Sequence, residues 1–69
     1  MPTNNNPQIE AKNLSIVDDQ LNHEALAVKK YKQAAQMCTT QELIDICNQG
    51  AQRHKKHYDD LLNYLNSHS

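Results

Sequence analysis

Three side chains able to bind metals or share protons fall where the surrounding pattern would place apolar residues. Glu24 lies on one helical stripe, between Leu21 and Val28. His54 lies near the centre of a second stripe, with His57 on its flank. A carboxylate is costly to bury unless it is paired or holds a metal ion, and imidazoles suit either role. These three residues are therefore the candidate functional group of the chain.

Positions along the chain place these three residues at one height in a pair of helices. Counted from a turn expected near residue 40, Glu24 lies 16 residues before it, and His54 and His57 lie 14 and 17 residues after it. At ~1.5 Å of rise per residue, all three lie within about one helical turn of each other. His54 and His57 are three residues apart, so both can point toward one centre.

The same count places Gly50, the single glycine of the chain, level with Tyr31. Glycine is costly inside a helix because it has the largest backbone freedom to lose. We therefore interpret Gly50 as making room either for the Tyr31 ring or for a closely packed partner helix.

The first stripe predicts a helix over about residues 15–38. Its apolar residues are spaced three and four apart, and Glu24 fills the one gap: Leu14, Val17, Leu21, Val28, Tyr31, Ala35 and Cys38. This spacing is typical of helices that pack at a shallow angle in bundles. Ser15 with Asp18 resembles a weak capping box, which sets the predicted start of the helix. The polar residues 1–13 are predicted to be a disordered or loosely attached arm.

The second stripe predicts a helix over about residues 40–66. Its members share one broad face: Leu43, Ile46, Cys47, Gly50, Ala51, His54, His57, Tyr58, Leu61, Leu62 and Leu65. Thr39 with Glu42 has the spacing of a capping box and marks the start. Residues 14–66 are therefore predicted to form an all-α, two-helix antiparallel hairpin, followed by a frayed tail at residues 67–69.

A hairpin of this size leaves much of both stripes in water, because each helix covers only part of the other. Such a chain is near the lower size limit for independent folding. The simplest remedy is a second copy, so we expect a homodimer that forms a four-helix bundle with two-fold symmetry.

Charge and composition exclude several classes of partner. Seven basic and eight acidic residues give a formal net charge of -1, which lacks the basic excess of a nucleic-acid binder. No apolar run approaches the ~20 residues of a membrane span, and the polar start is unlike a signal peptide, so we expect a cytoplasmic protein. Cys38 and Cys47 have no CxxC spacing and are interpreted as two small buried thiols.

The pattern around Glu24 resembles half of a ferritin-like or rubrerythrin-like bundle. Ala27 and Tyr31 follow Glu24 by three and seven residues, and the second helix carries His54-x-x-His57. More specifically, roughly residues 14–66 resemble the short spore coat protein F-like family of endospore-forming bacteria. That family resemblance implies a ferritin-like four-helix bundle, a role in sporulation, a location in the cytoplasm or spore coat, and other coat proteins as further partners.

The resemblance also implies a site, with one departure from it. Ferritin-like proteins carry a Glu on one helix and Glu-x-x-His on the next, twice, around two metals. Glu24 matches the first Glu and His57 matches the His, but His54 stands where the second Glu belongs. A dimer would then hold two carboxylates and four imidazoles. This set is less suited to di-iron oxygen chemistry and favours ions such as zinc, copper or nickel.

Three classes of function remain open. The first is a non-catalytic structural or assembly protein of the spore coat type. The second is a metal-binding bundle with a di-metal carboxylate and histidine site, in which Glu24, His54 and His57 are ligands to divalent ions (Fe, Zn or Mn). The alternative for the same residues is a hydrogen-bonded network without metal. The third is a helical hairpin that serves as an adaptor for another protein. No pattern for nucleophilic catalysis is present, since neither Cys is level with a His, and we assign no catalytic residue.

Overall fold

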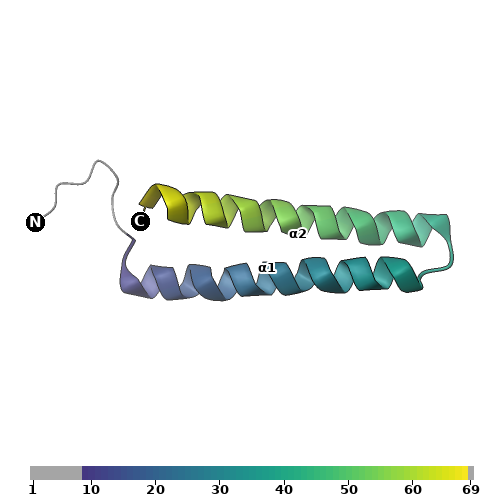
Figure 1. Ribbon diagram of the computed structural model, residues 1–69, viewed down its shortest axis with the longest axis horizontal. Coiled ribbons are helices and arrows are strands. Elements are labelled where there is room, and N and C mark those ends of the chain that lie inside the picture. Colours follow the sequence, from purple (N-terminus) through teal and green to yellow (C-terminus); the bar gives the residue numbers. More distant parts are fainter. Residues whose placement is uncertain (1–8, 69) are drawn as a thin grey trace, which may run out of the picture.

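Two long antiparallel helices make up the fold (Figure 1). The computed structural model describes residues 9–68, which form α1 (Ala11–Met37) and α2 (Gln41–His68) and contain no strand. This confirms the predicted all-helical hairpin. Within the described residues, neither helix is long and apolar enough to cross a membrane.

The first helix begins earlier than its sequence signal indicates. α1 begins at Ala11 rather than near Ser15, so the weak capping box does not mark its start. Glu10 is the N-cap, in extended conformation, and its side chain makes no capping hydrogen bond. Its carbonyl oxygen instead accepts the Leu14 backbone N–H at 2.8 Å, which closes the first helical turn.

The ends of the hairpin meet through the backbone. The Ile9 N–H donates to the His68 carbonyl at 3.2 Å, and residues 9–13 of the predicted arm therefore belong to the hairpin. Residues 67 and 68 of the predicted tail continue α2. The His68 ring stacks on Tyr64 with centroids 4.0 Å apart, and its Nδ1 donates to the Tyr64 carbonyl at 2.8 Å. Residues 1–8 of the arm and residue 69 of the tail lie outside the described residues.

A short turn joins the helices and is capped by a different threonine from the one predicted. The Cys38 N–H donates to the Ala34 carbonyl at 3.0 Å and closes α1. The Leu43 N–H donates to Thr40 Oγ1 at 3.3 Å, so Thr40 caps α2 in place of Thr39. The residue three positions after Thr40 is Leu43 and not a Glu. The return hydrogen bond from a Glu side chain to the backbone N–H of the cap residue, which completes a capping box, is therefore absent here.

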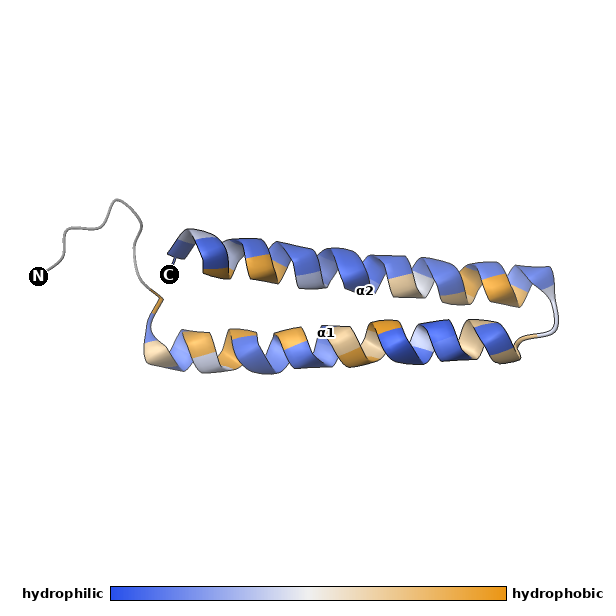
Figure 2. Cartoon of the chain, viewed as in Figure 1, coloured by the Kyte–Doolittle hydropathy of each residue, from blue (hydrophilic) through white to orange (hydrophobic). Residues whose placement is uncertain are grey.

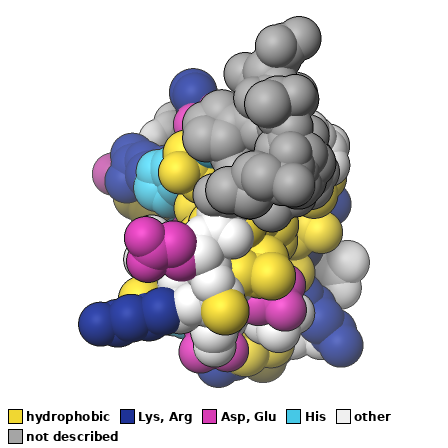
Figure 3. Space-filling model, turned by 90° about the vertical axis from the view of Figure 1, so that its left-hand side faces the viewer, with side chains coloured by type: hydrophobic (Ala, Val, Ile, Leu, Met, Phe, Trp, Pro, Cys, Tyr) yellow, Lys and Arg dark blue, Asp and Glu magenta, His cyan; other side chains and the backbone are white. Residues whose placement is uncertain are grey.

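The hairpin buries few side chains. Among the described residues only Leu21, Ala51 and Glu24 are buried, with exposed fractions of 9%, 4% and 6%. Apolar segments recur along both helices, and the middle of α2 is hydrophilic (Figure 2). Seen from the end that carries the termini, apolar side chains reach the surface between charged ones (Figure 3). Large apolar residues that are exposed on the hairpin are Leu14, Ile16, Leu26, Tyr31, Met37, Leu43, Ile46, Leu62 and Tyr64.

Candidate metal centre

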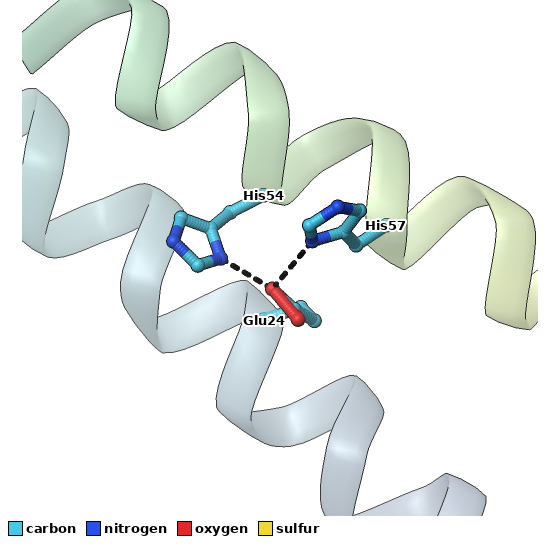
Figure 4. A group of neighbouring side chains, drawn as sticks. All are labelled: Glu24, His54 and His57. Carbon is cyan, nitrogen blue, oxygen red and sulfur yellow. Dashed lines mark hydrogen bonds and ion pairs between the residues drawn. The ribbon is translucent and has the colours of Figure 1, made fainter. Parts of the chain in front are cut away.

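One carboxylate from α1 and two imidazoles from α2 point toward a common centre (Figure 4). Nδ1 of His54 forms a hydrogen bond with Oε1 of Glu24. Nδ1 of His57 lies 3.6 Å from the same oxygen. The structure therefore brings together all three residues that the sequence selected. The two imidazoles sit one turn apart on α2, as their spacing of three predicts.

The cluster is closed on one side and open on the other. Only 8% of the Glu24 side chain is exposed, against 24% for His54 and 51% for His57. The carboxylate is thus held between the helices, while the His57 ring borders solvent. Within the described residues no buried side-chain nitrogen or oxygen lacks a hydrogen-bond partner, so the network satisfies the polar groups that it buries.

The electrostatics of the cluster favour an ionised carboxylate. The hydrogen bond from His54 is the largest cause that lowers the pKa of Glu24 below its usual 4.5, and attraction to the His54 and His57 imidazoles adds to it. Burial acts in the opposite direction, because it disfavours the charged form. An ionised carboxylate can only accept hydrogen bonds, so Nδ1 of His54 carries the proton in this contact.

Packing against Tyr31 orients the His54 ring. The two rings stack with centroids 5.4 Å apart at 24°, and His54 meets His57 edge-on at 5.8 Å and 85°. A Cβ atom built on Gly50 would lie only 2.5–2.9 Å from three atoms of the Tyr31 ring. The interpretation that Gly50 makes room for Tyr31 is confirmed. Contacts thus run from Gly50 through Tyr31 and His54 to Glu24.

The spacing of His57 and Glu24 suits a small divalent ion, whereas Nδ1 of His54, which donates a hydrogen bond to Glu24, has to exchange its proton for the ion before it can bind one. One nitrogen from each imidazole and one carboxylate oxygen all lie within 4.8 Å of one another. A tetrahedral zinc site with bonds of ~2.0–2.1 Å has ligand atoms about 3.4 Å apart. The 3.6 Å between Nδ1 of His57 and Oε1 of Glu24 is close to this distance between ligand atoms, and it is too long for a hydrogen bond. Among the described residues this is the one group of three or more potential ligands so gathered.

The structure also brings Cys38 and Cys47 into contact, which the sequence analysis did not predict. The Sγ atoms of Cys38 and Cys47 lie 3.9 Å apart next to the turn, and both residues are half-buried rather than buried. A signal for this contact was available, because the two residues occupy the two stripes on either side of the turn. Burial is the main cause that raises the pKa of the Cys47 thiol, and the neighbouring Cys38 raises it further.

Comparison with known proteins identifies no family for this chain. A scan against protein-family models and searches of curated proteins and of solved structures found no match to the chain. The resemblance to spore coat proteins therefore stays an expectation drawn from the residues around Glu24, His54 and His57. The fold and the cluster together define a helical hairpin with one candidate metal centre.

The lowered pKa of Glu24 predicts an acid-dependent loss of stability. A group whose folded pKa lies below its unfolded value stabilises the fold above the unfolded value, and loses this contribution as the pH falls through the folded one. Wild type should therefore exceed Glu24→Gln in Tm near neutral pH, and the gap should close as the pH falls below 4.5. Thermal melts of both proteins from about pH 7 to about pH 3.5 measure it. Parallel curves over this range would contradict the prediction.

The contact between Gly50 and Tyr31 predicts opposite effects of one substitution in two backgrounds. Gly50→Ala should destabilise the natural chain by roughly 1 kcal/mol, because the ring must leave its place. In a Tyr31→Ala background the same change should stabilise by ~1 kcal/mol, since only the helix penalty of glycine is removed. Urea unfolding of the four proteins gives the coupling free energy. An equal effect in both backgrounds would refute the contact.

Proposed function

We propose that this chain is a non-catalytic, metal-binding helical hairpin in which Glu24, His54 and His57 hold one divalent ion between α1 and α2. The observation that supports this function is the convergence of one carboxylate oxygen and two imidazole nitrogens from two helices. An ion at this point stabilises the folded hairpin by mass action, because it binds the folded chain more tightly than the unfolded one. Its role is structural: it joins α1 to α2 at mid-length.

The donor set indicates which ions suit the site. Two imidazoles and one carboxylate are a common set for zinc, and iron(II) and manganese(II) accept the same mixture of nitrogen and oxygen ligands. Three protein ligands leave a further coordination position, on the side where the half-exposed His57 borders solvent. Water completes the coordination of an ion held by three protein ligands.

Metal titration tests the site. Isothermal titration of metal-stripped protein with zinc, iron(II) or manganese(II) should give one site per chain. At ~100-fold excess over the Kd, the ion should stabilise the fold by ~2.7 kcal/mol, seen as a Tm rise of roughly 10 °C. Glu24→Gln and His57→Ala should each weaken the affinity at least about tenfold.

The matched control is His23→Ala. His23 is exposed and directly precedes Glu24, so its removal should leave the affinity unchanged. Equal losses for His23→Ala and His57→Ala would show scattered surface binding and contradict the proposal. Absence of binding by all three ions would instead leave Glu24, His54 and His57 as a metal-free network.

A second proposal concerns assembly: the hairpin associates with itself into a four-helix bundle and acts as a structural building block of the spore coat type. The exposed apolar side chains support it, since Ile16 is 54% and Ile46 52% exposed, and residues 9–68 bury almost no core. A shallow groove of about 300 Å³ near the termini is lined mainly by apolar residues, namely Ile9, Asn13, Ile16, Val17, Leu61 and Tyr64. A second hairpin offers an equally long surface to cover them.

Sedimentation equilibrium tests the assembly. Wild type should have the mass of two chains, and Ile16→Lys and Ile46→Lys should shift it toward one chain, because a buried ammonium opposes association. Asn22→Lys adds the same charge at an exposed polar position of α1 and should leave the dimer intact. A folded wild-type monomer would contradict self-association and would favour an adaptor whose stripes another protein covers.

A further inference from the structure

A pair of thiols lies beside the turn that joins the two helices, away from the metal centre at mid-length. Cys38 directly follows α1, and Cys47 lies in the second turn of α2. Their Sγ atoms are 3.9 Å apart, and both residues are half-buried free cysteines. The chain has two cysteines in all, so each has one possible intramolecular partner.

The surroundings of the thiol pair favour a disulfide over a metal site. A zinc site needs at least three protein ligands, and no further His, Cys, Asp or Glu in the described residues joins this pair in a group of three. A disulfide requires two ligand-free thiols whose sulfur atoms approach to ~2.05 Å with a Cβ–S–S–Cβ dihedral angle of about 90°. Cys38 lies beyond the last residue of α1 in extended conformation, so rotating its side chain and adjusting its backbone disturb no helical hydrogen bond beyond the one that its own N–H makes.

We propose that Cys38 and Cys47 form a reversible intramolecular disulfide that fastens α1 to α2 beside the turn. With a small-molecule disulfide such as oxidised glutathione as the oxidant, one cysteine thiolate attacks a glutathione sulfur and expels one glutathione thiolate. The second cysteine thiolate then attacks the protein-bound sulfur of this mixed disulfide and expels the second. Two cysteine thiols are oxidised, one glutathione disulfide is reduced to two thiols, and the protons pass from protein to glutathione.

The expected consequence is a more stable hairpin, not a redox catalyst. The bond closes the short loop between Cys38 and Cys47 and so reduces the conformational entropy of the unfolded chain. The raised pKa of Cys47 makes its thiolate scarce at neutral pH and a poor leaving group. Both effects slow exchange, which suits a lasting structural link and opposes the rapid cycling of a catalytic dithiol.

The experiment compares reduced and oxidised full-length protein. Incubation with oxidised glutathione should yield a product lighter by two hydrogen atoms in intact mass, without added glutathione and without a covalent dimer on a non-reducing gel. Its Tm should exceed that of the reduced protein by roughly 10 °C, as expected for a short closed loop in a small domain. Dithiothreitol should restore the original mass and Tm.

Single-cysteine variants serve as controls. Cys47→Ser and Cys38→Ser each retain one thiol, and should give a glutathione adduct or an intermolecular disulfide with no rise in Tm. The proposal is overturned if wild type gives these same products, or if its disulfide form melts at or below the Tm of the reduced form. It is equally overturned if the folded wild type resists oxidation while the urea-unfolded chain forms the bond. The wild-type comparison alone decides, so an unfolded variant does not obscure the result.

Discussion

The burial of the Glu24 carboxylate between two helices is the constraint around which the site is organised. A charge held at 6% exposure needs compensation, and both groups that supply it come from α2. Because Glu24 and the imidazoles lie on different helices, their contact also sets the height of α1 against α2. A shift of either helix along its axis would separate the carboxylate from its donors, at the free-energy cost of an unpaired buried charge.

Packing supports this contact from the side. Tyr31 stacks on His54, and the Tyr31 ring fits there because Gly50 has no side chain. The glycine costs helix stability and in return allows an aromatic ring to fix an imidazole. Ala51, next to it, is the most buried apolar residue of the hairpin, which is consistent with close helix approach at this level. The polar centre therefore adjoins a closely packed part of the interface.

All three proposals address the same physical feature, the small buried core of the hairpin. The proposed divalent ion at mid-length, second copy over the exposed apolar side chains and disulfide beside the turn would each add stability that two amphipathic helices supply poorly by themselves. They act at different places and on different states. The proposed ion and second copy would bind the folded chain, whereas the proposed disulfide would restrict the unfolded one.

Periodicity and level counting from the sequence alone predicted the hairpin, the meeting of Glu24 with His54 and His57, and the space that Gly50 leaves for Tyr31. They succeed because helical rise and turn angle are nearly constant, so spacing translates directly into position. The helix start at Ala11 and the cap at Thr40 differ from the local sequence signals, and only the tertiary structure decided how closely the Cys38 and Cys47 sulfur atoms approach. Local capping signals are worth about 1 kcal/mol, so a contact of similar size, such as the backbone hydrogen bond of Ile9 with His68, is enough to move a helix end.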